Sequence, residues 1–166
     1  MISSEMYLIM GRSSHTLLLR SYFGEYGLKY NMLRVPIGGT DFSTHPYSYN
    51  EQPADDLKLS NYTLAYEDYA YKIPMIKSMM NVVTTPIQIV ASTWSPPSWM
   101  KTNNDGGQSR LKLAYYQTYA DYHLKFLEKY QANGIPIWGI TTTNEPSFSG
   151  INKLNSLGWS INEMGD

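Results

Sequence analysis

The chain alternates three times between segments with helical periodicity and short apolar runs. The segments with helical spacing are residues 15–28, 67–83 and 113–134. Each is followed by an apolar run of strand length, at residues 30–37, 86–93 and 135–143. Regular alternation with brief connections from helix to strand predicts parallel βα units and an α/β fold.

Long loops follow the first two apolar runs, at residues 38–61 and 94–110. Loops of this length inside compact domains are usually functional. Elaborate loops at the carboxyl ends of parallel strands are typical of a (β/α)8 TIM barrel. Because three strands do not close a barrel, we expect a partial barrel of about three βα units with open edges. A doubly wound sheet is the alternative, but Gly38-Gly39 is too short to match its phosphate-binding turn.

Composition excludes several classes of function. The formal charge of −1 and the lack of a basic run argue against a nucleic-acid partner. Cysteine is absent, which excludes disulfides and thiolate chemistry. The three histidines, His15, His45 and His123, fit no metal spacing, so we expect no metal and no other cofactor.

Targeting signals are sparse. The opening residues, MISSEMYLIM, lack the charged start and long apolar core of a secretory signal peptide. No stretch approaches the roughly 20 apolar residues of a membrane span. Asn61-Tyr62-Thr63 is a glycosylation sequon, which is used only if the chain enters the secretory route.

The third helical segment carries an aromatic stripe at helical spacing. Its members are Tyr115, Tyr119, Tyr122, Phe126 and Tyr130. Tyrosine combines a flat apolar face with a polar tip, which suits both sugar binding and ordinary packing, so composition alone leaves the choice open. Near the end of the chain, Ser160 and Glu163 have the spacing of a capping box, which predicts the start of a helix.

A carboxylate follows the third apolar run. Glu145 lies between Asn144 and Pro146, where proline turns the chain away from the sheet. A carboxyl group at such a strand end, flanked by aromatic residues, is a candidate general acid. The alternative is a loop carboxylate that caps a turn.

Other polar and aromatic residues are expected on the same rim. Asp41 follows the first apolar run, and Trp94 and Trp99 follow the second. Carboxylates bind hydroxyl groups and indoles stack on sugar rings, so this set suggests a sugar site, although Trp99 also fits a packing role. Arg34 lies inside the first expected strand, where a buried arginine needs a partner; an ion pair or a brace for a catalytic carboxylate is expected.

Three stretches together resemble the glucosylceramidases of glycoside hydrolase family 30. They are RVPIGGTDFS (34–43), ASTWSPPSWMKTN (91–103) and TTTNEPS (141–147). The tryptophan-rich middle stretch is the most specific of the three, because many barrel glycosidases carry Asn-Glu-Pro. The resemblance begins near residue 16, so residues 1–15 are treated as an unmatched segment and residues 16–166 as a partial TIM-barrel catalytic domain.

The resemblance implies a role for each candidate residue. Glu145 is similar to the general acid/base, Asn144 to the asparagine that binds the sugar 2-hydroxyl, and Arg34 to the arginine that supports the carboxylates. Asp41 and Trp99 are similar to sugar-binding residues, with Trp94 beside them, and Asn61 matches a glycosylated position. Retaining glycosidases need a second carboxylate as nucleophile, and no residue of this chain corresponds to it.

The resemblance also implies the reaction and its setting. It implies hydrolysis of the β-glucosidic bond of glucosylceramide to glucose and ceramide, with the isolated chain inactive for want of the nucleophile. A lysosomal or secreted location, an activator protein and a membrane surface are implied as well. Two alternatives stay open: a non-catalytic sugar- or glycolipid-binding protein, and a related barrel hydrolase with another sugar preference.

Overall fold

A computed structural model describes residues 12–102, 109–148 and 155–163 of the chain. Helices and strands alternate in the order α2, β1, α3, β2, α4, β3. The helices are α2 (Arg12–Phe23), α3 (Ile73–Met80) and α4 (Tyr116–Ala132). The strands are β1 (Met32–Ile37), β2 (Gln88–Thr93) and β3 (Gly139–Thr141). Most of residues 1–15 lies outside the described residues, as does the chain after Glu163.

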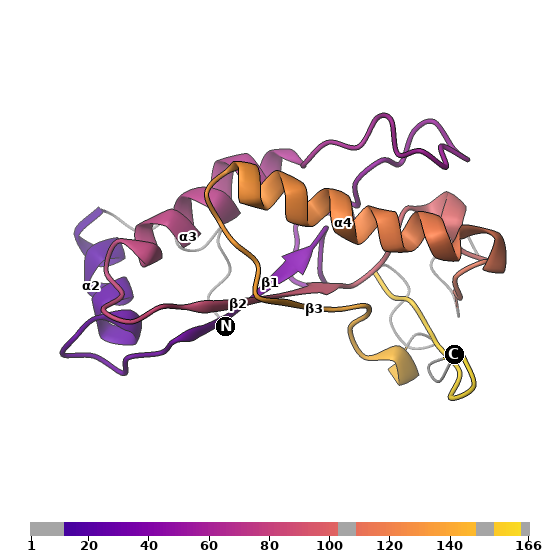
Figure 1. The fold of residues 1–166 in the computed structure, drawn as a ribbon. Coiled ribbons are helices and arrows are strands. Elements are labelled where there is room, and N and C mark those ends of the chain that lie inside the picture. The colour runs from indigo at the N-terminus through magenta and orange to yellow at the C-terminus, as the bar shows by residue number, and fades with distance from the viewer. Residues whose placement is uncertain (1–11, 103–108, 149–154, 164–166) are drawn as a thin grey trace.

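The described strands form a parallel sheet in the order β1-β2-β3. Strand order thus follows chain order, and α3 and α4, which connect the strands, lie on the same side of the sheet (Figure 1). A doubly wound sheet places helices on both faces, whereas a barrel places them all outside. The fold is therefore an unclosed part of an α/β barrel, as the sequence predicted.

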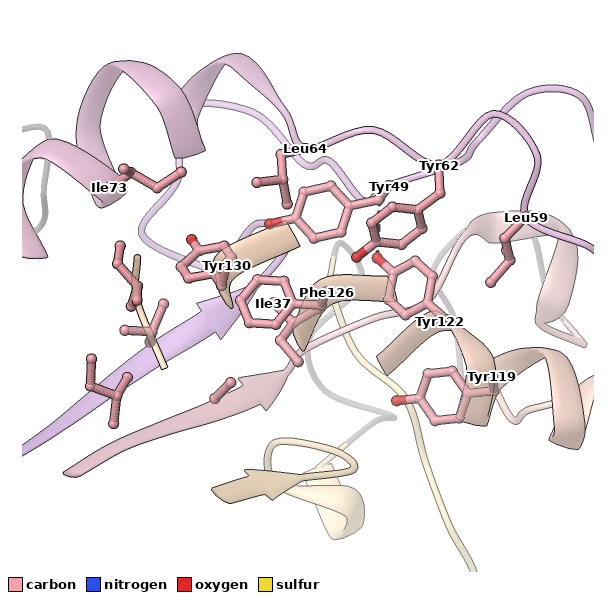
Figure 2. Packing of buried hydrophobic residues seen from close by; sticks show 14 of the residues in the cluster. Ile37, Tyr49, Leu59, Tyr62, Leu64, Ile73, Tyr119, Tyr122, Phe126 and Tyr130 are labelled. Atoms are coloured by element: carbon pink, nitrogen blue, oxygen red, sulfur yellow. Dashed lines mark hydrogen bonds between the residues drawn. The ribbon is translucent and has the colours of Figure 1, made fainter. Parts of the chain in front are cut away.

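The core lies between the sheet and these two helices. Val35 and Ile37 of β1 and Ile89 and Ala91 of β2 point toward it and are at most 3% exposed. Opposite them lie the aromatic residues of α4, which pack with Tyr49 and Tyr62 from the long loop after β1 (Figure 2). The stripe read in the sequence is therefore largely core, although Tyr115 precedes the helix and is partly exposed.

A buried ion pair ties the first loop to the helical layer. Asp68 is fully buried and pairs with Lys72, whose side chain is 9% exposed, at 3.3 Å. Asp68 also accepts hydrogen bonds of 2.8 Å from the hydroxyls of Tyr49 and Tyr130. The Lys72 ammonium donates to the carbonyl oxygens of Pro36 at 3.1 Å and of Gly38 at 2.9 Å. Lys72 thereby fixes the carboxyl end of β1, just before Asp41.

Two expected strands differ from the structure. The third spans only three residues instead of 135–143, because it pairs with β2 alone and its other edge is unpaired among the described residues. The first was expected to be buried, but only one of its faces is, and Met32 on the other face is 53% exposed. Apolar content does not reveal that a strand is covered on one side only.

The helices also differ in detail. The second begins as a π-helical turn, Asp68–Lys72, and becomes α-helical at Ile73, where Pro74 occupies the first turn of α3. The first expected helix ends at Phe23, within the expected range of 15–28. The capping box is formed: the Glu163 carboxylate accepts the Ser160 amide proton at 2.6 Å and the Glu163 amide donates to the Ser160 hydroxyl at 3.3 Å. No helix in the described part is long and apolar enough to cross a membrane.

Candidate active site

An arginine links the three strand ends. The Arg34 guanidinium donates to the Ser92 hydroxyl at 2.7 Å and to the Asn144 amide oxygen at 2.8 Å. It also lies 4.8 Å from the centre of the Trp94 ring, within cation–π range. Because the Asn144 oxygen accepts from Arg34, the amide nitrogen of Asn144 is directed elsewhere and is available to a ligand.

The sequence analysis expected a buried Arg34 that either forms an ion pair or braces a catalytic carboxylate. In the structure Arg34 is exposed, because it lies on the face of β1 that turns away from the helices. Its hydrogen-bond partners among the described residues are the neutral side chains of Ser92 and Asn144. Within the described part of the chain, no carboxylate therefore pairs with the Arg34 guanidinium.

The rim residues Asp41 and Trp94 lie together. The Trp94 indole nitrogen donates to the Asp41 carboxylate at 3.2 Å, which joins the loops after β1 and β2. Asp41 is exposed, and Trp94 is 9% exposed. Arg34 on one side and Asp41 on the other therefore hold the indole in place at the strand ends.

Glu145 has an unusual backbone. Its φ is +45°, in the left-handed region that few non-glycine residues adopt, and Pro146 follows it at the start of a short helical turn. This conformation costs about 1–2 kcal/mol for an ordinary residue, and such strain persists only where the surroundings enforce it. The residue is exposed at the end of β3. Strained backbone conformations of this kind often occur at functional sites.

The loop before Glu145 is supported from behind by Thr93, the last residue of β2. The Thr93 carbonyl accepts the Asn144 amide proton at 2.7 Å, and its hydroxyl shares a hydrogen bond of 2.9 Å with the ring of His123. Alongside, the hydroxyls of Ser92 and Thr141 share a hydrogen bond of 2.5 Å. The sequence analysis missed these three supporting hydroxyls. The sequence did hint at them, because the second apolar run ends in Ser92 and Thr93 and the third ends in three threonines at 141–143.

Acidification is expected to destabilise the fold through His123. Burial lowers the pKa of His123 below its usual 6.5, and its hydrogen bond to the Tyr119 carbonyl opposes this only in part. Below pH 6.5 the unfolded chain therefore binds more protons than the folded chain, and the free energy of unfolding falls by up to about 1.4 kcal/mol per pH unit. Above this range both states are neutral and the effect vanishes.

Denaturant titrations at pH 7.5 and pH 5.5 would measure this contribution. The loss of stability between the two values should be smaller by about 1 kcal/mol in His123→Gln than in the unaltered chain. Glutamine keeps a donor and an acceptor without the titration. An equal pH dependence in both proteins would exclude His123 as the cause.

Trp99 lies apart from these contacts. It is 6% exposed, donates its indole proton to the Asn50 carbonyl at 2.9 Å and packs edge-on against Tyr115 at 5.1 Å. The structure therefore brings together Arg34, Trp94, Asp41 and Asn144, with Glu145 next in the chain, but leaves Trp99 in the packing behind the rim. Its role as a sugar-binding residue stays a prediction.

Comparison with known proteins gives the chain a family. The Glycosyl hydrolase family 30 TIM-barrel domain matches residues 4–164, which is nearly the whole sequence. The chain belongs to glycoside hydrolase family 30. This match begins within residues 1–15, the segment for which the sequence analysis found no counterpart.

The family 30 relatives include glucosylceramidases. The chain is 42% identical over 148 residues to a protein named putative glucosylceramidase 3 of Caenorhabditis elegans, which covers 87% of this chain. It is 40% identical over 145 residues, or 84% of this chain, to the lysosomal acid glucosylceramidase of Mus musculus. The chain spans 28% of the length of each of these two proteins.

A solved glucanase structure has a similar fold. The endo-β1,6-glucanase BT3312 superposes with a TM-score of 0.84 at 26% identity. The superposition covers 97% of this chain and 36% of the glucanase. The partial barrel described above therefore corresponds to about a third of the glucanase chain.

Proposed function

We propose that this chain supplies the acid/base half of the active site of a retaining β-glycosidase that cleaves the glucosidic bond of glucosylceramide. The observation that carries the proposal is the presentation of Glu145. Its carboxylate is exposed at a strand end, on a strained backbone, beside an asparagine whose orientation Arg34 fixes. The membership of a hydrolase family does not favour the alternative of a non-catalytic sugar-binding protein.

The proposed reaction has two steps. In the first, the Glu145 carboxyl donates its proton to the glycosidic oxygen while a second carboxylate attacks the anomeric carbon, so ceramide leaves and a glucosyl-enzyme forms. In the second, Glu145 takes a proton from water, which attacks the same carbon and releases glucose. The two carboxyl groups of such enzymes lie about 5 Å apart.

The nucleophile is proposed to come from outside this chain. Asp41 is the other rim carboxylate, but it accepts a hydrogen bond from Trp94 and is assigned to binding sugar hydroxyls. In this proposal Asn144 binds the 2-hydroxyl through its free amide nitrogen, and Arg34 supports the carboxylates. Trp94 and Trp99 line the sugar pocket, the latter only if its loop opens.

A second candidate is a family 30 hydrolase that prefers another sugar linkage. The observation in its favour is the fold similarity to an endo-β1,6-glucanase, with a TM-score of 0.84. Identity favours the first candidate, because the two glucosylceramidase relatives share 40% or more of their matched residues with this chain.

The experiment that separates the two candidates is a segment exchange. This chain would replace its matching segment in the C. elegans relative and in the endo-β1,6-glucanase, and kcat/KM would be measured on glucosylceramide and on a β-1,6-glucan. We expect the first chimera to hydrolyse glucosylceramide and the second to lose glucan activity relative to its parent. Efficient glucan cleavage by both chimeras would contradict the glucosylceramide proposal. The 166-residue chain alone should show no turnover of a fluorogenic β-glucoside.

Location and surroundings are part of the proposal. The mouse relative is named lysosomal, which supports a lysosomal or secreted site for this chain. Asn61 is exposed, as a glycosylation acceptor must be. We propose that it carries a glycan, so that Asn61→Gln removes the gel shift caused by deglycosylation after secretory expression. The activator protein and the membrane surface implied by the resemblance stay proposals.

A further inference from the structure

The hydroxyls of two tyrosines of α4, Tyr119 and Tyr122, reach two separate parts of the chain. The Tyr119 hydroxyl donates to the Thr142 carbonyl, in the loop after β3. The Tyr122 hydroxyl accepts the Tyr49 amide proton at 3.1 Å, in the loop after β1. Figure 2 shows Tyr119 beside, rather than within, the ring cluster that Tyr122 forms with Tyr49 and Tyr62. The stripe is therefore more than apolar filling, because each hydroxyl fixes a different backbone segment.

We propose that Tyr119 is a positioning residue, whose hydroxyl holds the loop that carries Asn144 and Glu145. The proposal rests on the proposed function, in which Glu145 is the acid/base. Thr142 lies three residues before Glu145, so a bond at its carbonyl restrains the loop close to the carboxylate. Tyr119 would not touch the substrate; it acts through the backbone.

Several contacts hold this loop within the described part of the chain, including a hydrogen bond of 3.1 Å from the Thr143 hydroxyl to the Leu157 carbonyl. The Tyr119 hydroxyl binds the Thr142 carbonyl, the Thr93 carbonyl binds the Asn144 amide, and Arg34 binds the Asn144 side chain at 2.8 Å. Arg34 is exposed, whereas Tyr119 is 4% exposed. The Tyr119–Thr142 hydrogen bond is partly buried, although Thr142 itself is exposed, whereas the Arg34–Asn144 bond is exposed, so the former competes less with water and is the stronger restraint. Such a restraint is what a left-handed Glu145 requires, since a strained backbone persists only when its surroundings over-determine it.

The hydroxyl is separable from the ring. The Tyr119 ring packs edge-on against His123 at 4.5 Å, a contact that phenylalanine would keep. Burial raises the pKa of Tyr119 well above 10.0, so the hydroxyl stays protonated and remains a donor at every physiological pH. Tyr119→Phe therefore keeps the ring packing and removes the hydrogen bond to the Thr142 carbonyl, together with the contact between the Tyr119 hydroxyl and the Thr93 side chain.

Hydrogen exchange of the whole chain, followed by NMR, tests the proposal with Tyr122→Phe as the matched control. In Tyr119→Phe the Asn144 amide, which bonds the Thr93 carbonyl, should exchange about tenfold faster, while the Tyr49 amide is unchanged. In Tyr122→Phe the pattern should reverse, because that hydroxyl accepts from Tyr49. Equal acceleration of both amides in Tyr119→Phe would show general loosening of the core, and an unchanged Asn144 would show no restraint. Either result overturns the proposal.

The chimera of this chain with the C. elegans relative adds a kinetic measurement. Tyr119→Phe should lower kcat about tenfold with KM nearly unchanged, because the carboxylate is misplaced while the sugar contacts remain. A rise in KM alone would overturn the positioning role. If Glu145→Gln leaves the chimera fully active, the proposed function fails, while the exchange experiment still reports whether Tyr119 restrains the loop.

Discussion

Replacing Glu145 by glutamine in the chimera with the C. elegans relative is expected to lower kcat/KM on glucosylceramide about 10²–10⁴-fold. This is the usual contribution of a general acid/base. The loss should depend on the leaving group. Ceramide is a poor leaving group that requires protonation, whereas 2,4-dinitrophenolate leaves without it, so the first step on the activated glucoside should be almost unaffected. Steady-state and pre-steady-state kinetics on both substrates would measure the difference.

The matched control for this experiment is Glu128→Gln. Glu128 is an exposed carboxylate of α4 with the same charge, but it lies outside the strand ends. It should leave kcat/KM within about twofold of the parent value, as surface changes usually do. If Glu145→Gln affects both substrates equally, the carboxylate binds sugar and does not transfer a proton. The assignment of the acid/base would then be wrong.

The largest loss of stability is expected from Lys72→Met. This change leaves the fully buried Asp68 without its cationic partner and removes the hydrogen bonds that Lys72 donates to the carbonyls of Pro36 and Gly38. Breaking a buried ion pair from one side typically costs about 3–5 kcal/mol. Urea denaturation followed by tryptophan fluorescence would measure the free energy of unfolding.

Two further variants define the cause. Lys77→Met removes an exposed charge from the same helix and should change stability by less than about 0.5 kcal/mol. The double variant Asp68→Asn/Lys72→Met removes the stranded charge, so it should recover part of the loss caused by Lys72→Met alone. If the double variant is no more stable than Lys72→Met alone, the isolated charge of Asp68 does not explain the loss.

The order of elements could be predicted from the sequence, but the exposure of the strands could not. Hydrophobic periodicity placed the helices and strands in the right order and with the right pairing type. It overestimated the third strand, because apolar residues such as Ile140 occur on an edge strand whose outer partner is lacking among the described residues. Sequence pattern reports which residues are apolar, and only tertiary structure reports what covers them.

The strand-end location of the site followed from the sequence, whereas its internal contacts did not. Asp41, Trp94 and Asn144 follow their strands as expected; Arg34 contacts Trp94 and Asn144, and Trp94 in turn contacts Asp41. That Arg34 pairs with an amide and a hydroxyl depends on the register of three strands, which no local pattern encodes. The same holds for Tyr119, whose hydroxyl reaches a residue 23 positions away.

The left-handed backbone at Glu145 lowers the stability of the fold, whereas the carboxylate at this position is needed for the proposed reaction. Glycine adopts a φ of +45° without the steric cost of about 1–2 kcal/mol that glutamate bears, and this outweighs the roughly 0.5–1 kcal/mol of extra backbone entropy that glycine loses on folding, so Glu145→Gly stabilises the fold slightly while it deletes the carboxylate. A directed-evolution screen that rewards heat resistance alone would therefore enrich glycine at position 145. If Glu145 is the acid/base proposed above, such a screen would lower turnover, and a stabilisation programme applied to this sequence should hold that codon fixed.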